Sequence, residues 1–216
     1  MARARTGRPT APSPAEMHRS WLELVDVEGP FLAIPPLKRV WPNGIPGFRS
    51  IHPDRYTTLA DARKEFEAAW DQADKHPDDE KTQASYREAR DQWVQTVLRD
   101  VIGWQDSLVW GDATGIQAQS PSLTVTISPQ GVLTDPDGAH AALVYVIDPV
   151  DSLRETPNDG WAATPIDRLE ELLRASDIPI GIITDGRWWG LVSARTGSMP
   201  ASGVVDSLTW IEEPRT

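Results

Sequence analysis

The chain has 216 residues, of which 39% are apolar and 25% are charged. This composition is that of a globular protein, and the length is sufficient to bury a core. The absence of cysteine excludes disulfide bonds, a thiolate nucleophile and cysteine-ligated zinc or iron–sulfur sites. No apolar run approaches the roughly 18 residues that a membrane helix needs, so we expect a cytoplasmic protein with no membrane partner.

The net charge of −11 is unevenly distributed. Residues 1–103 hold 15 Lys or Arg and 16 Asp or Glu, whereas residues 104–216 hold 6 Arg and 16 Asp or Glu. An acidic surface repels phosphate groups. The second half alone is therefore predicted to be a poor nonspecific DNA binder and to face a protein or another part of the same chain.

The first half of the sequence is predicted to be helical after a short tail. Residues 1–15 contain Arg and Pro without a hydrophobic stretch, which is typical of a flexible basic tail. Apolar residues at helical spacing predict a short helix over 16–27, and a proline-rich, irregular connector follows over 31–48. Two longer helices are expected over 58–73 and 82–102, and the short loop between them favours an antiparallel pair.

The periodicity changes from helical to alternating in the second half. Strands are predicted at 123–128, 141–147, 178–184 and 188–194. The second of these is the best candidate for a central strand, because it is apolar throughout. Turn residues separate the first two strands, and an Asp-Gly turn joins the last two into a hairpin.

A helix-start signal lies between the second and third strands. Thr164 can cap the helix, Pro165 suits its first position, and Asp167 favours the first turn. The sequence therefore predicts an α/β fold of the α+β type. A helical region over residues 16–104 is expected to pack on a mixed-sheet domain over residues 105–216.

The order of strands, turns and helix in the second half resembles the core of PD-(D/E)xK restriction nucleases. Such a core needs an acid at a turn, an acid on the central strand and a lysine two residues further on, because the acids hold magnesium and the lysine activates water. Asp135 or Asp137 could supply the first acid and Asp148 the second, but Val150 stands at the lysine position. No lysine follows Lys81, so the domain is predicted to be nuclease-like without the catalytic lysine.

Other catalytic and metal-binding motifs are missing from the sequence. A methyltransferase needs a glycine-rich loop for S-adenosylmethionine and, for adenine-N6 chemistry, an Asn/Asp-Pro-Pro-aromatic motif, and neither occurs. A phosphate-binding loop of the G-x-x-x-x-G-K-[ST] kind is also missing. The four histidines are far apart in sequence, and none has a second ligand at helical spacing. The sequence thus predicts no catalytic, cofactor or metal site in this chain.

Residues 161–194 read WAATPIDRLEELLRASDIPIGIITDGRWWGLVSA. This segment resembles one that is common in type IIG restriction–modification proteins and in methyltransferases of phage-defence systems such as DISARM. There a capped helix precedes the pattern P-x-G-x-x-T-[ND]-G-x-x-W-x-L. Residues 20–41 and the helix that ends in WVQTVLRDVIGW also look like the start of actinobacterial members. The matched positions of the hairpin pattern are Pro179, Gly181, Thr184, Asp185, Gly186, Trp189 and Leu191.

The resemblance implies a nuclease-like N-terminal domain followed by an adenine-specific DNA methyltransferase domain that uses S-adenosylmethionine. The sequence stops at Thr216 before such a domain, so we expect a fragment, a split gene product or a truncated reading frame. DNA, through the full-length protein or complex, and defence-system proteins are the implied partners. In the hairpin, Asp185 and Gly186 supply the turn, while Trp188 and Trp189 point to opposite faces. These four residues are candidates for contact with a partner.

Three functional hypotheses follow. The first is a non-catalytic scaffold region of a DNA adenine methyltransferase in restriction–modification or phage defence. The second is a divergent magnesium-dependent DNA endonuclease that uses Asp135 or Asp137 with Asp148 and takes Arg154 as a displaced cation. The third is a free-standing protein-interaction module that uses its acidic α/β face.

Overall fold

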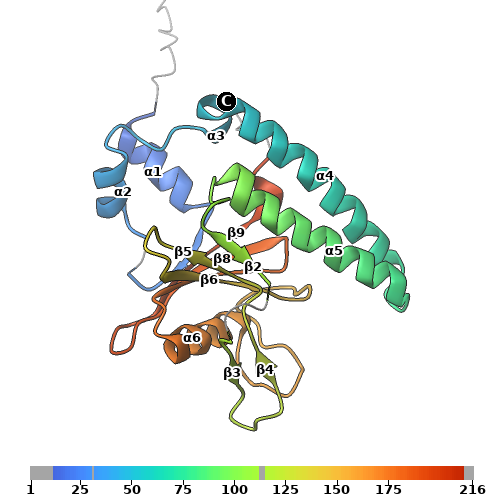
Figure 1. Cartoon of the computed structure of the whole chain (residues 1–216). Coiled ribbons are helices and arrows are strands. Elements are labelled where there is room, and N and C mark those ends of the chain that lie inside the picture. The colour runs from blue at the N-terminus through green and yellow to red at the C-terminus, as the bar shows by residue number, and fades with distance from the viewer. Residues whose placement is uncertain (1–11, 31, 112–114, 212–216) are drawn as a thin grey trace, which may run out of the picture.

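The structure, a computed structural model, describes residues 12–30, 32–111 and 115–211. Within these residues a seven-stranded mixed sheet forms the centre of the molecule (Figure 1). In this sheet β6 and β7 are parallel, and every other neighbouring pair is antiparallel. In spatial order the strands are β1 (Asp26–Glu28), β9 (Ala201–Asp206), β8 (Trp188–Ser193), β7 (Ile180–Thr184), β6 (His140–Val146), β5 (Gly131–Thr134) and β2 (Leu108–Trp110).

Three long helices cover the sheet: α4 (Pro53–Lys75), α5 (Glu80–Thr96) and α6 (Pro165–Ser176). Side chains of a strand alternate between faces, and β6 shows this directly. Val144 and Val146 belong to the buried cluster that α4 and α5 share, whereas Leu143 and Tyr145 belong to the cluster under α6. Figure 1 shows the α4–α5 pair on one face and α6 on the other. The expected mixed α/β class is confirmed, with helices on both faces of a mixed sheet.

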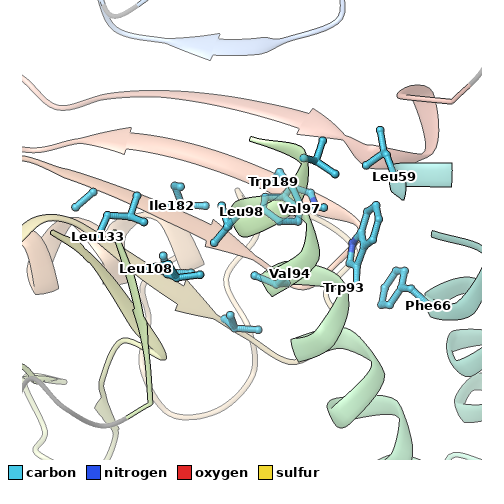
Figure 2. Packing of buried hydrophobic residues seen from close by; sticks show 14 of the residues in the cluster. Leu59, Phe66, Trp93, Val94, Val97, Leu98, Leu108, Leu133, Ile182 and Trp189 are labelled. Carbon is cyan, nitrogen blue, oxygen red and sulfur yellow. The ribbon is translucent and has the colours of Figure 1, made fainter. Parts of the chain in front are cut away.

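Aromatic side chains hold the α4–α5 pair on the sheet. Trp93 of α5 is 1% exposed and stacks on Phe66 of α4, with ring centroids 5.9 Å apart. It also meets Trp189 of β8 edge-on at 6.4 Å, as Figure 2 shows. Both predicted helices are confirmed. The first begins earlier than expected because Pro53 fits a first helical turn, and the second continues through a π-helical turn, η1 (Val97–Val101).

Helix α6 begins with the signal that the sequence predicts. The Thr164 hydroxyl accepts the Asp167 N–H at 3.1 Å, and the Asp167 carboxylate accepts the Thr164 N–H at 3.0 Å. This reciprocal capping box satisfies two backbone N–H groups at the start of the helix, with Pro165 in its first turn. The predicted strands on either side of this helix are confirmed as β6, β7 and β8.

The strand predicted over 123–128 is wrong for most of its length. The hydroxyl of Ser120 accepts two backbone N–H groups, both at 3.1 Å, and folds the chain into a turn. Leu123 lies in that turn with φ of +58° and is 72% exposed. Pairing begins only at β4 (Thr126–Ile127), which forms a separate two-stranded sheet with β3 (Ala118–Gln119).

The irregular connector predicted over 31–48 is partly wrong, because it contains helix α2 (Ile34–Val40). Pro35 and Pro36 fall in the first turn of this helix. Backbone N–H groups in a first turn make no hydrogen bond within the helix, so proline, which lacks the N–H, costs nothing there. Proline therefore starts the helix here, whereas the prediction took it as a sign of irregular structure.

The N-terminal helix α1 (Pro14–Leu22) starts at a capping box on Ser13. It ends earlier than the predicted helix over 16–27, because the chain turns into β1. A single turn, α3 (Phe48–Ile51), leads into α4. Residues 1–11 of the predicted basic tail lie outside the described residues.

The described residues on the two sides of the boundary predicted near residue 104 pack against each other. β1 from the first half pairs with β9, and α4 and α5 share one buried cluster with residues of the central strands. After β9, a short 3-10 turn, η2 (Ser207–Thr209), leads the chain back to α4. There the Tyr56 hydroxyl donates to the Ile211 carbonyl at 3.1 Å. None of the described helices has both the length and the apolar character to cross a membrane.

Candidate functional site

The acids that the nuclease hypothesis combines lie at opposite ends of strand β6. Asp135 sits in the β5–β6 turn, where its carboxylate accepts the N–H groups of Asp137 and Ala139, both at 2.9 Å. Asp148 follows the other end of β6, whose seven residues span about 20 Å at roughly 3.3 Å per residue. The fold therefore does not bring Asp135 or Asp137 together with Asp148. Among the described residues no group of three or more His, Asp or Glu could hold a metal ion.

Arginine side chains from helix α5 neutralise Asp148. Arg90 lies with its Nη1 3.1 Å from Asp148 Oδ1, and the same nitrogen donates to the Ile147 carbonyl at 2.8 Å. Arg87, one helical turn earlier, lies 3.7 Å from the same carboxylate oxygen. The helical half thus does bring positive charge to the end of β6, as guanidinium groups and not as a lysine. At the expected lysine position, the Val150 N–H donates to the buried carboxylate of Asp185.

Arg154, the displaced cation of the nuclease hypothesis, is used elsewhere. Its guanidinium pairs with Asp26 and Glu28 on the edge strand β1, and the contact to Glu28 is 2.8 Å. It also donates to the Ser202 hydroxyl on β9 at 3.1 Å. Arg154 therefore fixes the β1 edge of the sheet and does not complete a site with Asp148.

Asp185, in the β7–β8 turn, is a buried structural carboxylate. Its Oδ1 accepts the N–H groups of Arg187 and Trp188 at 2.9 and 2.7 Å, and its Oδ2 accepts the Val150 N–H at 3.2 Å. Burial raises the pKa of this carboxyl above its ordinary value, while the three backbone hydrogen bonds act in the opposite direction. One side chain thus fixes both the hairpin turn and the loop that follows β6.

Gly186 is the point at which the helical pair meets the sheet. Its carbonyl accepts the indole N–H groups of Trp93 and Trp189, at 2.8 and 3.0 Å. Its φ is +99°, and a Cβ at this position would lie 2.5 Å from Phe66 Cζ. Beside it, the Tyr86 hydroxyl donates to the Asp185 carbonyl at 3.1 Å. Both the backbone conformation and the close approach of α4 therefore require glycine.

The two hairpin tryptophans point to opposite faces of the sheet, as expected. Trp189 is buried under the helical pair, and Trp188 packs partly buried on the α6 side with the Arg187 guanidinium over its ring. Asp185 and Gly186 are buried as well. Contact with a partner, the expected role of these four residues, is therefore corrected for three of them: they are covered by the chain itself, and Trp188 alone keeps some exposed surface.

A cavity of about 520 Å³ opens beside Asp148, between α5, the end of β6 and the start of α6. Its charged lining consists of three arginines and two aspartates: Arg87, Arg90, Arg168, Asp148 and Asp159. Arg168 is 7% exposed and holds Asp159 through two contacts of 2.6 and 2.7 Å. These hydrogen bonds lower the pKa of the Asp159 carboxyl, so the pair stays ionised. The cavity is therefore lined by two buried arginines, Arg90 and Arg168, and by the partly exposed side chains of Arg87, Asp148 and Asp159.

Uncharged polar groups complete the wall of this cavity. Tyr145 of β6 is 7% exposed, and burial raises the pKa of its hydroxyl to about 12. Gln130, just before β5, accepts the Val146 N–H on its Oε1 at 2.6 Å and also lines the cavity. Both side chains are therefore neutral hydrogen-bonding groups at neutral pH.

Sequence reasoning did not find this cavity. Arg87 and Arg90 lie three residues apart on one helical face, and this spacing was the only available signal. Asp159 and Arg168 are joined by a loop and a cap whose geometry no motif describes, and Tyr145 reads simply as part of an apolar strand. A scan of protein-family models, a search of curated proteins and a search of solved structures found no match to this chain. The function of this chain is therefore inferred from the contacts around Asp148 and around the β7–β8 turn.

Proposed function

We propose that this chain is a non-catalytic scaffold region of a DNA adenine methyltransferase in restriction–modification or phage defence, built on a degenerate nuclease-like sheet. The observation that carries the proposal is that the Asp148 carboxylate is paired with arginines. This acid follows the central strand, yet its partners are Arg87 and Arg90, and the turn acids lie at the far end of β6. On this proposal, arginine pairing replaces metal binding at the end of a nuclease-like strand.

The hairpin motif supports the same proposal. The residues through which the sequence resembles defence methyltransferases include Thr184, Asp185 and Gly186. The Thr184 hydroxyl accepts the Gly186 N–H within the turn, and the carbonyls of Asp185 and Gly186 accept hydrogen bonds from Tyr86 and Trp93 of α5. On this proposal the motif holds the helical pair on the sheet. Methylation, S-adenosylmethionine binding and base recognition would belong to a methyltransferase domain that acts with this region, and DNA contact would be made through that complex.

The test starts with the DNA around the gene. The proposal expects a methyltransferase reading frame that contains a glycine-rich loop and an Asn/Asp-Pro-Pro-aromatic motif. Co-expression of that frame with this chain should give a complex that co-purifies and methylates adenine faster than the methyltransferase alone. Unrelated neighbouring genes, or a methyltransferase that neither binds this chain nor responds to it, would contradict the proposal.

A cleavage assay separates the scaffold from the nuclease hypothesis. Purified protein with plasmid DNA and Mg²⁺ should give no more nicking than its Asp148→Asn variant, which removes the carboxylate at the end of β6. Arg195→Gln, an exposed change elsewhere, serves as the purification control. Cleavage that Asp148→Asn abolishes and Arg195→Gln retains would overturn the assignment as a scaffold.

A further inference from the structure

The cavity beside Asp148 gathers arginine side chains in an acidic protein. Three arginines face two aspartates in its wall, whereas the chain as a whole carries −11. Both aspartates are already paired, Asp148 with α5 and Asp159 with Arg168. Arg90 also pairs with Asp91 at 3.2 Å, so Arg87 is the lining arginine with the weakest carboxylate contact, at 3.7 Å. Since charges beyond about 8 Å are largely screened at physiological salt, a small anion in the cavity experiences the local arginines more than the distant acidic surface.

Several groups in the wall retain hydrogen-bonding capacity. Within the part of the chain that the structure describes, the Tyr145 hydroxyl makes no hydrogen bond, although the side chain is 93% buried and lines the cavity. Gln130 also lines the cavity, and its amide NH2 has no acceptor among the described residues. Since Gln130 presents a donor and Tyr145 can donate, the groups left over favour a ligand rich in acceptors.

Arg87 adds a charged donor that can turn to a ligand. Its contact with Asp148 is 3.7 Å, and its side chain is 54% exposed. Exposed ion pairs of this kind contribute little to stability, so exchanging Asp148 for a ligand oxyanion costs little. Arg90 remains on the Ile147 carbonyl at 2.8 Å and keeps Asp148 paired. The site can therefore accept an anion without leaving a buried charge unpaired.

We propose that this cavity binds a small phosphate monoester of mononucleotide size. Donors from α5, β6 and the start of β5 surround the cavity, which suits the several acceptor oxygens of a phosphate. The volume of about 520 Å³ lies in the range of small-molecule sites, roughly 300–1,000 Å³. It exceeds the need of a phosphate ion alone and leaves room for a nucleoside. The proposal is independent of the scaffold function.

A nucleic-acid strand fits the same wall less well. A strand extends over many phosphates, and residues 104–216, which supply most of the wall, hold 6 Arg against 16 Asp or Glu. Each further phosphate would meet an acidic surface. The charge distribution therefore favours one phosphate group held locally over a continuous backbone.

The test is a binding titration of the whole chain with AMP, followed calorimetrically at 150 mM salt. Adenosine tests the need for the phosphate, inorganic phosphate tests the need for the nucleoside, and a single-stranded DNA 12-mer tests the polymer. AMP is expected to bind saturably with a dissociation constant below about 1 mM, adenosine not at all, and phosphate as a weaker competitor. Phosphate that binds as tightly as AMP would overturn the mononucleotide assignment. Binding of the 12-mer that AMP cannot displace would overturn it as well.

Two cavity variants locate the site. Arg87→Gln removes a charged donor from an exposed position, and Tyr145→Phe removes only the hydroxyl, so both keep the packing. We expect affinity for AMP to fall about tenfold or more for the first and about threefold for the second. Arg195→Gln makes the same change of charge away from the cavity and should leave affinity unchanged. Equal losses in Arg87→Gln and Arg195→Gln, or unchanged affinity in both cavity variants, would refute the site.

Discussion

Two Asp-Gly turns in this chain use the same residue types for different purposes. The β5–β6 turn, with Asp135 and Gly138, is exposed, and a Cβ on Gly138 would meet nothing within 4 Å. The β7–β8 turn, with Asp185 and Gly186, is buried beneath the helical pair, and a Cβ on Gly186 would strike Phe66. The comparison shows that the residue types of a turn determine its backbone bend. How much a turn contributes to the free energy of unfolding depends on what packs over it.

The largest effect should come from removing the indole that lies over the buried turn. Trp93→Ala deletes a side chain that is 1% exposed and leaves a cavity between α5 and the sheet, which should lower the free energy of unfolding by about 3–5 kcal/mol. Urea unfolding measures this. Trp41, which is 39% exposed, supplies the control, since Trp41→Ala should cost less than about 1 kcal/mol. Equal losses would show that Trp93 does not hold the two layers together.

Replacing Gly138 or Gly186 with alanine compares the exposed turn and the buried turn directly. Both have positive φ, +83° at Gly138 and +99° at Gly186, so alanine carries a backbone cost of roughly 1–2 kcal/mol in each turn. Gly186→Ala adds a clash with Phe66, and overpacking of this kind costs about 1–3 kcal/mol more. The difference between the two variants in urea unfolding isolates the contribution of helix docking. A difference near zero would mean that α4 moves aside without loss.

Asp185 should also make stability depend on pH in a direction opposite to that of a salt-bridged acid. Its pKa is raised in the folded protein, chiefly by burial, so the folded state holds its proton to higher pH than the unfolded state does. Its contribution to the free energy of unfolding should therefore fall as pH rises from about 4, the unfolded value, through the folded pKa, and then stay level.

Asp185→Asn removes this titration while it keeps a carbonyl acceptor for the turn. Unfolding of both proteins at closely spaced pH values tests the expectation, with Asp135→Asn as the matched change in the exposed turn. The stability of the wild type relative to Asp185→Asn should decrease over the acidic range. A relative gain of stability with rising pH would show that the backbone hydrogen bonds outweigh burial.

The smallest effect is expected in the exposed turn itself. Asp135→Ala removes the acceptor of two N–H groups, those of Asp137 and Ala139. Water can replace a partner at an exposed site, so the loss should be about 0.5–1.5 kcal/mol. Differential scanning calorimetry resolves this difference. A loss as large as that of Gly186→Ala would show that the exposed turn also supports the core.

Local signals in the sequence predicted the elements that depend on them. The capping box at Thr164, the apolar run that became β6 and the helical spacing of α4 and α5 are all readable over a few residues. The strand over 123–128 failed because one hydroxyl, that of Ser120, competes for the backbone N–H groups that a strand would use. Helix α2 was not predicted because proline, here Pro35 and Pro36, occurs both in the first turn of helices and in irregular loops.

The contacts between distant segments were beyond prediction from a single sequence. β1 and β9 lie at opposite ends of the chain, and nothing local indicates that they pair. The meeting of Trp93 with the Gly186 carbonyl, and of Arg90 with Asp148, likewise depends on how the helical pair sits on the sheet. The candidate cavity is made of such contacts, and no local pattern in the helix or in the strand indicates them.

The pairing of β1 with β9 also has a consequence for synthesis of the protein. Within the described sheet β1 is an edge strand whose neighbour is β9, the last strand among the described residues (Figure 1). On the ribosome, Asp26–Glu28 must therefore wait until Ala201–Asp206 has been translated and has left the exit tunnel. At roughly 5–20 residues per second, the N-terminal segment stays without its partner for many seconds. Assembly of this sheet edge is thus completed only after β9 has left the tunnel.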